Sequence, residues 1–348
     1  FWNPKNVTAE EFLKCNGDTV ILLGKEGSRC LRAGTNVSIP LAVSHYGESN
    51  LDDSVLKWEA KGGPGNCSGS IEIDSLPQGK FTQVGTAELD LPGSEKGYKF
   101  ELRVTLIHRQ KTVNTNNWSY WAFPEIDSPV VKAVAFGETA EAGPGIFTML
   151  GKSGSSAIPD GTKLLVTDHV DAKIVDYVAG GGDCLLFTSG AAIENEHIYY
   201  QGMPNYHTYF RTIPWNSGPG NSGTVISEHP MLAKFPHEDL CDLQFVSMIH
   251  GAIPMEFAPL IKYGVSPIIR SIDWYQTNLN NAYLLEFKVG GGRVIASTLY
   301  IPKGARSHVE TRNLVNSLVG YARGTRFNPT ADVPRDEFLR LFSPKKSK

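Results

Sequence analysis

The chain has 348 residues, of which 41% are hydrophobic and 20% charged, a balance typical of globular proteins that excludes disorder and a coiled coil. Its length suits two domains, each with its own core. The net charge of -3 and the scattered Lys and Arg residues argue against nucleic-acid binding, and no apolar run is long enough for a membrane span.

The first part of the chain is predicted to be a β-domain. Turn residues separate seven candidate strands, at 19–23, 36–44, 55–60, 70–74, 86–91, 98–108 and 117–123. Within 98–107, apolar and polar residues alternate, as they do in a sheet with one buried face. This spacing predicts an immunoglobulin-like β-sandwich over residues 1–123, with another two-sheet sandwich, such as a jelly roll, as the alternative.

Residues 124–129 are expected to be a linker, and an α/β domain is predicted from 130 to 328. Apolar runs at 130–136, 163–167 and 184–188 predict strands buried on both faces. A helix over 168–178, with Asp168 as its N-cap and glycines 180–182 at its end, connects the last two strands. Strand, helix and strand in this order predict a right-handed crossover and a parallel sheet.

Residues 266–321 are predicted to close this domain. A short strand is followed by a hairpin, with strands at 282–289 and 293–300 joined by glycines 290–292. Apolar residues at helical spacing from Leu314 to Ala322 predict an amphipathic helix, and Gly324 is expected as its left-handed C-cap. Residues 329–348 are expected to form a C-terminal tail with a short helix at 336–342.

No cofactor or metal site is predicted. Glycines 180–182 follow a helix, whereas phosphate-binding glycines precede one. Metal-binding spacing is absent from the cluster formed by His229, His237, Glu238, Asp239 and Asp242, and the two histidines are interpreted as turn residues.

Five cysteines, with no Cys-x-x-Cys pair, indicate free thiols, although a bridge between Cys15 and Cys30 stays open. Cys184, at the start of a strand, is interpreted as a buried apolar residue rather than a nucleophile. The pair Asn195-Glu196 is interpreted as a chance match to glycosidase sequences, because the chain has no room for a (β/α)8 barrel.

Aromatic residues supply the candidate binding site. Flat rings can stack on sugars or anchor a protein interface. The candidates are Trp215, Trp274, Tyr275, Tyr206 and Tyr209, together with Asp273. Asp273 and Trp274 follow a predicted strand, at a position where open α/β sheets bind ligands.

Two long segments carry a family resemblance. PIIRSIDWYQTNLNNAYLLEFKVGGGRVIASTLYI and HPMLAKFPHEDLCDLQF resemble the C-terminal region of large glycoside hydrolase family 2 proteins, the β-galactosidase-like enzymes of polysaccharide-degrading Bacteroidetes. VTAEEFLKCNGDTVILL, HYGES, VLKWEA and NNWSYWAFP resemble the β-sandwich that follows the catalytic barrel in those proteins.

The resemblance implies that the chain is an internal fragment, as Phe1 in place of Met also suggests, and that a catalytic barrel precedes it. It also implies that the second domain is flavodoxin-like, similar to glutamine-amidotransferase-like domains that have lost the nucleophile cysteine. None of the family's catalytic residues can be transferred to this chain. The parent would be exported to the periplasm, the cell surface or the extracellular space.

The leading hypothesis is therefore a non-catalytic accessory region that braces the barrel or assembles homo-oligomers. The alternatives are a carbohydrate-binding module that uses the Tyr and Trp cluster, and an independent Cys-dependent hydrolase.

Overall fold

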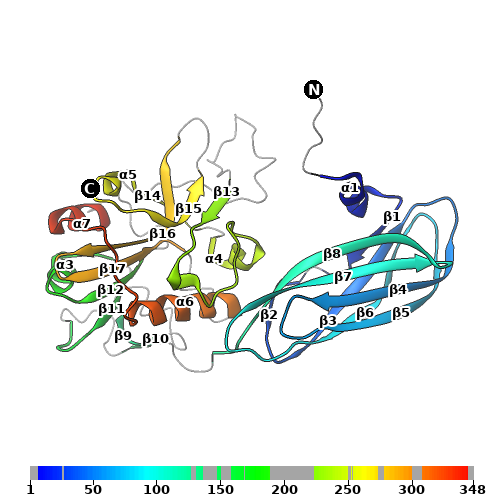
Figure 1. Ribbon diagram of the computed structural model, residues 1–348, viewed down its shortest axis with the longest axis horizontal. Coiled ribbons are helices and arrows are strands. Elements are labelled where there is room, and N and C mark those ends of the chain that lie inside the picture. Colours follow the sequence, from blue (N-terminus) through cyan, green and yellow to red (C-terminus); the bar gives the residue numbers. More distant parts are fainter. Residues whose placement is uncertain are drawn as a thin grey trace, which may run out of the picture. The chain divides into compact units, whose positions relative to one another are not determined.

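A computed structural model describes residues 7–25, 27–126, 131–135, 147–149, 158–167, 169–188, 223–249, 252, 254–272, 278–299 and 308–343. The chain divides into two compact units, Phe1–Glu125 and Ile126–Lys348 (Figure 1). Among the described helices, none is long and apolar enough to cross a membrane. The protein is thus a β-rich chain of two units with several sheets.

The first unit begins with helix α1 (Ala9–Asn16) and continues as two sheets. A capping box starts the helix, since the Glu11 amide donates to Thr8 Oγ1 at 3.1 Å and the Thr8 amide donates to Glu11 Oε2 at 2.9 Å. One sheet has the order β1 (Thr19–Leu23), β3 (Asn36–His45) and β6 (Lys80–Asp90). The other has the order β2 (Cys30–Arg32), β8 (Lys111–Phe123), β7 (Tyr98–His108), β4 (Leu51–Lys61) and β5 (Cys67–Leu76).

The core of this unit is formed by residues from both sheets. Leu102 and Val104 of β7 are fully buried, as are Leu41 and Val43 of β3, and all four belong to one apolar cluster. The seven strands expected from the sequence are all present, and 19–23 and 98–108 match the observed bounds. Strand β2 was not predicted, because three residues are too few to show a period of two.

Within the described residues, the second unit forms a mixed sheet of nine strands. Five of them run parallel, in the order β10 (Phe147–Met149), β9 (Val131–Ala135), β11 (Leu164–Thr167), β12 (Asp183–Phe187) and β17 (Gly292–Ser297). An antiparallel part follows, with β16 (Asn280–Val289), β15 (Pro267–Ile272) and β13 (Gly223–Ile226), while β14 (Met255–Glu256) pairs with β16. The predicted parallel strands and the predicted hairpin are both confirmed.

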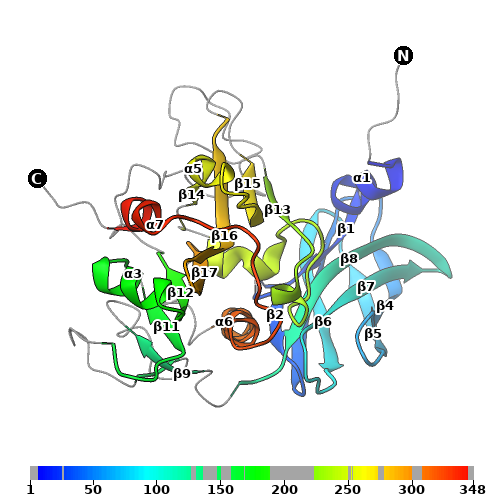
Figure 2. The ribbon, with the colours of Figure 1, turned by 60° about the vertical axis from the view of Figure 1, so that its left-hand side comes forward.

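Helices cover both faces of this sheet (Figure 2). Helices α3 (Ala172–Ala179) and α7 (Arg335–Phe342) pack on one face, where Ile174, Phe287 and Phe338 share a buried cluster. Helix α6 (Val309–Ala322) lies on the other face. The short helix η2 (Pro230–Leu232) packs against α6. The remaining short helices are η3 (Leu243–Phe245), α4 (Val246–Ile249) and α5 (Ala258–Ile261).

The glycine runs of the sequence meet at one end of α3. Gly290 has a φ of +60°, which favours glycine, in the turn between β16 and β17. A Cβ atom on Gly292 would lie 2.1 Å from the Val178 carbonyl oxygen and 2.2 Å from that of Gly182. Glycine is therefore required here because the hairpin and the end of α3 are in close backbone contact.

Two helix caps differ from the prediction. The N-cap of α3 is Asp171 rather than Asp168, because Asp171 Oδ1 accepts a hydrogen bond from the Ile174 amide at 2.9 Å. Asp168 lies outside the described residues. The C-cap residue of α6 is Arg323, with φ −91° and ψ −12°. It is not a left-handed Gly324, as the sequence predicted. The Gly324 amide donates to the Tyr321 carbonyl at 2.9 Å, a tight last turn that needs no left-handed residue.

The last part of the chain belongs to the core of the second unit. The Val333 amide donates to the Lys288 carbonyl at 2.9 Å, which attaches this segment to β16. Phe338 is fully buried against Phe287, with ring centroids 5.7 Å apart. The helix expected at 336–342 is present as α7, but it is packed into the domain rather than forming a tail beyond residue 328.

Candidate functional site

A concave site lies beside the second half of α6, and we call it the α6 groove. Its volume is about 340 Å³. Met231 and Lys234 line it from η2 and the turn after it, Asn316 and Tyr321 line it from α6, and Arg326 lines it from the following loop. Three separate segments of the second unit therefore form one surface.

The α6 groove combines apolar, neutral polar and cationic side chains. Ser317 and Thr325 add hydroxyl groups to the lining, and none of the lining residues is an aspartate or a glutamate. Gly320 faces open space, since a Cβ atom built there would meet no atom within 4 Å. The groove therefore has room for a ligand at the middle of its helical wall.

A histidine and a glutamate lie behind this wall. His229 caps η2, and its Nδ1 accepts a hydrogen bond from the Met231 amide at 3.3 Å. Nδ1 is thus unprotonated, so the ring proton is on Nε2, which lies 3.3 Å from Glu286 Oε1. The two side chains are only 18% and 14% exposed. The His229 ring also packs edge-on against Tyr321, with centroids 5.3 Å apart.

Tyr321 connects this pair to the groove. Burial raises the pKa of its hydroxyl, and the neighbouring Glu286 carboxylate raises it further, while Arg293 and Arg326 act in the opposite direction. Tyr321 is therefore a neutral phenol at physiological pH. A side-chain hydrogen bond with Glu286 also contributes to the raised pKa, so the phenol links the His229–Glu286 pair to the back of the groove.

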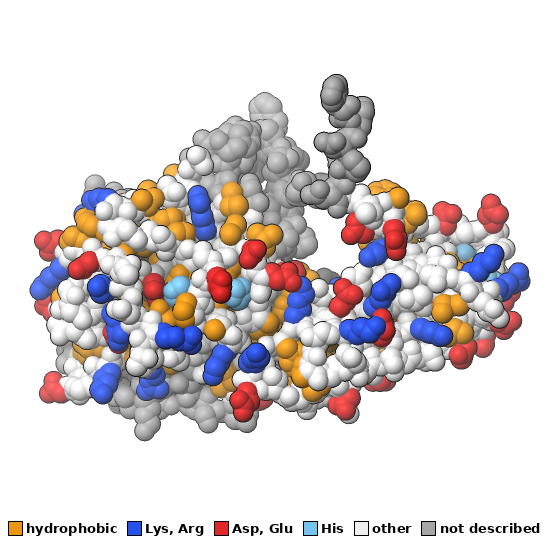
Figure 3. Space-filling view, viewed as in Figure 1, with side chains coloured by type: hydrophobic (Ala, Val, Ile, Leu, Met, Phe, Trp, Pro, Cys, Tyr) orange, Lys and Arg blue, Asp and Glu red, His pale blue; other side chains and the backbone are white. Residues whose placement is uncertain are grey.

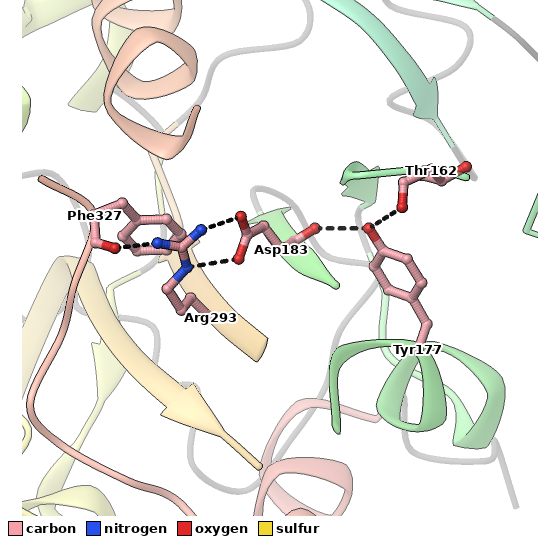
Figure 4. Close-up of polar contacts among 5 residues, drawn as sticks. All are labelled: Thr162, Tyr177, Asp183, Arg293 and Phe327. Carbon is pink, nitrogen blue, oxygen red and sulfur yellow. Dashed lines mark hydrogen bonds and ion pairs between the residues drawn. The ribbon is translucent and has the colours of Figure 1, made fainter. Parts of the chain in front are cut away.

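An arginine holds the wall of the groove in place (Figure 4). Arg293 Nε donates to Asp183 Oδ1 at 2.8 Å and Nη2 donates to Oδ2 at 2.5 Å. The same guanidinium donates to the Phe327 carbonyl and lies 4.7 Å from the centre of the Phe327 ring. On the other side, Tyr177 Oη donates to the carbonyls of Thr162 and Asp183. These contacts fix the loop that carries Arg326 to the sheet.

A second polar cluster lies at the N-terminus of α6. Ser247 Oγ donates to Glu310 Oε1 at 2.7 Å and lies 3.2 Å from Thr311 Oγ1, and His308 Nδ1 is 3.2 Å from the same carboxylate oxygen. A nucleophilic serine is activated by an adjacent general base, most often a histidine. Here the Glu310 carboxylate stands between Ser247 and His308, so the cluster holds α4 to α6 and does not have the arrangement of a serine–histidine pair.

A row of buried polar side chains crosses three strands of the same sheet. Thr224, Ser271 and Asn281 are direct cross-strand neighbours and are 6%, 0% and 0% exposed. Within the described part of the chain, Ser271 Oγ and both amide atoms of Asn281 have no hydrogen-bond partner. Each such atom costs about 1–3 kcal/mol, so packing alone does not explain the row.

The site residues expected from the aromatic pattern are not among those described. Trp215, Tyr206 and Tyr209, and likewise Asp273, Trp274 and Tyr275, all lie outside the described residues.

The other side chains considered from the sequence are placed as follows. Cys184 is fully buried, as expected, and burial raises the pKa of its thiol. His229 caps a turn, as expected, but also reaches Glu286, whereas the half-buried His237 contacts the carbonyl of its neighbour Glu238. No metal-binding group of three or more His, Cys, Asp or Glu residues is present in the described ranges. None of the five cysteines forms a disulfide.

Sequence reasoning missed Glu286 and Tyr321. One signal for Glu286 was available: it is an acidic residue within the apolar strand segment YLLEFKV. Because side chains alternate along a strand, it lies on the face opposite to Leu285 and Phe287. Nothing in the sequence indicated that His229 and Tyr321 meet it.

These features define a β-rich protein of two units, with a candidate binding groove in a mixed α/β unit. Residues 165–343 match the family described as a domain of unknown function (DUF8487), and since the match covers just over half of the chain, the protein belongs to that family. Residues 35–124 match a second domain of unknown function (DUF8488). No curated protein matches the chain.

Similar solved structures are only distantly related. An alkylpurine DNA glycosylase, AlkC, from Pseudomonas fluorescens is 9% identical, with 29% of this chain and 30% of that chain covered and a TM-score of 0.21. The E. coli curli protein CsgC is 16% identical, with 29% and 96% covered and a TM-score of 0.20. A family 123 glycoside hydrolase from Clostridium perfringens is 6% identical, with 32% and 26% covered and a TM-score of 0.21. Similarity at this level carries no argument about function.

Proposed function

We propose that the chain is a non-catalytic accessory region of an exported glycoside hydrolase that acts on polysaccharide or oligosaccharide. In this proposal the sandwich is immunoglobulin-like and the second unit is flavodoxin-like, resembling glutamine-amidotransferase-like domains. The five parallel strands with helices on both faces support the second assignment. Its partners would be a catalytic barrel in the same polypeptide and further copies of the chain.

The observation that carries the proposal is the nature of the α6 groove. It presents amide, hydroxyl and cationic groups together with apolar side chains around a small volume. Such a surface suits recognition of a small polar molecule, with mixed apolar and polar groups that fix its orientation. We infer that the second unit binds a saccharide here without cleaving it.

A binding assay combined with a turnover assay tests this function. The full chain is incubated with a panel of aryl glycosides and titrated calorimetrically with mono- and oligosaccharides. We expect no turnover, together with saccharide binding that disappears in Gly320→Phe and persists in Gly320→Ala. Clear hydrolysis would refute the non-catalytic assignment, and binding that is unchanged in Gly320→Phe would refute the groove.

The aromatic cluster provides the alternative binding surface. If binding persists in Gly320→Phe but is lost in Trp215→Ala or Trp274→Ala, the chain acts as a carbohydrate-binding module through those residues, and the α6 groove is not the site.

A Cys-dependent hydrolase is the least supported function. A reactive cysteine must be accessible and largely ionised, but Cys184 is fully buried with a raised pKa. Thiol labelling of the native chain should modify the exposed Cys15 and spare Cys184 until denaturant is added. Rapid native-state labelling of Cys184, with loss of a measurable activity, would restore this alternative.

A further inference from the structure

We propose that the α6 groove selects an anionic saccharide, one that carries a carboxylate or a sulfate group. This inference rests on the proposed function, because it names the class of ligand for the same groove. Three features support it: the positive charge of the lining, the neutral polar and apolar groups that complete the lining, and the anchored backbone beside Arg326.

The charge of the lining is entirely positive. Lys234 and Arg326 lie on two of the segments that form the groove, and neither forms an ion pair with any described residue. Figure 3 shows Lys and Arg side chains gathered over the α6 region. Two cations that have no ion-pair partner among the described residues and that face a concave surface favour an anionic ligand, since an acid between them gains charge-assisted hydrogen bonds from both.

The acidic residue that contacts Tyr321 lies outside the groove lining. Glu286 lies behind Tyr321, and its Oε1 is 3.3 Å from His229 Nε2. At the end of α6, the Val319 and Tyr321 carbonyls accept hydrogen bonds from the Arg323 and Gly324 amides at 3.1 and 2.9 Å. Capping reduces the negative field that the helix end would otherwise add.

The rest of the lining suits a sugar ring. Asn316, Ser317 and Thr325 offer amide and hydroxyl groups to ring hydroxyls, and the exposed Pro230 and Ala233 offer apolar surface to carbon-bound hydrogens. The volume of about 340 Å³ is near the lower limit of small-molecule sites and favours a short ligand over a long chain.

The backbone next to Arg326 is anchored to the sheet. Phe327 is fully buried, and its carbonyl and ring both contact Arg293, which is itself fixed by Asp183. This anchor keeps the base of the exposed Arg326 side chain at the groove, so the guanidinium stays within reach of a ligand there.

The test compares three sugars of the same ring. The full chain is titrated calorimetrically with D-glucose, D-glucuronate and D-glucose 6-sulfate, each at low and high salt. We expect at least one acidic sugar to bind about tenfold or more tightly than glucose, because hydrogen bonds to charged groups contribute about 1.5–3 kcal/mol, and this preference should shrink in salt. The acid that is preferred shows whether carboxylate or sulfate is the natural group.

Charge variants then test whether the preference for an acidic sugar arises in the α6 groove. Lys234→Gln combined with Arg326→Gln should lower the affinity for the acidic sugar about tenfold and leave glucose unchanged. Lys57→Gln combined with Arg323→Gln removes the same charge outside the groove and should change affinity less than about twofold.

The outcomes separate the two claims. If glucose binds as tightly as both acids, or if the groove variant behaves like the control, charge selection is refuted while saccharide binding by the groove stands. If none of the three sugars binds and no oligosaccharide of the panel does, the proposed function fails together with this inference.

Discussion

Replacing Arg293 with methionine tests how the wall of the α6 groove is stabilised. The change keeps most of the aliphatic volume but removes the two hydrogen bonds to Asp183, the bond to the Phe327 carbonyl and the charge that faces the Phe327 ring. Asp183 would keep a carboxylate that is only 15% exposed, without its cation.

The expected cost lies between two limits. Breaking a fully buried ion pair costs about 3–5 kcal/mol, whereas an exposed pair contributes about 0–1 kcal/mol. The Arg293 side chain is 31% exposed, so solvent screens part of the interaction and we expect a loss of about 2 kcal/mol. For a unit of this size, that loss lowers the melting temperature by about 4–8 °C.

Differential scanning calorimetry can measure this change on the transition of the second unit. The matched control is Arg335→Met, which breaks the ion pair between Arg335 and Asp176. These two side chains are 56% and 57% exposed, so the loss of stability should be less than about 1 kcal/mol. If Arg293→Met is no more destabilising than Arg335→Met, the reasoning that this pair secures the groove wall is refuted.

Three further predictions concern stability. Gly320→Ala should stabilise the second unit by about 0.5–1 kcal/mol in urea denaturation, because this exposed helical glycine has open space for a Cβ, and a loss would contradict the helical geometry. Ser271→Ala should be neutral or stabilising by up to about 1 kcal/mol, because its buried hydroxyl has no partner among the described residues, and a clear loss would reveal a bound water or ligand. The hydrogen bond from Arg340 lowers the pKa of Glu337. The ionised Glu337 therefore stabilises the folded unit above the ordinary pKa of 4.5, and this stabilisation is lost as pH falls through the lowered pKa of the folded state. Glu337→Gln should therefore weaken the acid-induced loss of stability, and an unchanged pH profile would show that the contact is unimportant.

Much of the fold follows from local pattern. The alternation in 98–108 predicts β7 because one face of that strand is buried, and the triple glycine predicts the hairpin because only a short flexible turn joins the two strands. The cap of α3 was misplaced because two aspartates precede the helix, and only the contact with the Ile174 amide distinguishes Asp171.

The groove could not be predicted in the same way. His229, Glu286 and Tyr321 belong to a turn, a strand and a helix that are far apart in the sequence, and they meet only because α6 packs beside η2 on one face of the sheet. Periodicity shows which face of an element is buried, but not which element covers it. The sequence therefore pointed to aromatic rings, while the described structure brings together a histidine, a glutamate and a tyrosine.

The most direct test is calorimetric titration of the wild-type chain, Gly320→Ala and Gly320→Phe with the three sugars and with an oligosaccharide, which is recovered and analysed afterwards. We predict that an acidic sugar binds to the first two proteins and not to the third, and that the oligosaccharide is recovered unchanged. Equal binding to all three proteins, or recovery of a cleaved product from an oligosaccharide, would contradict this prediction.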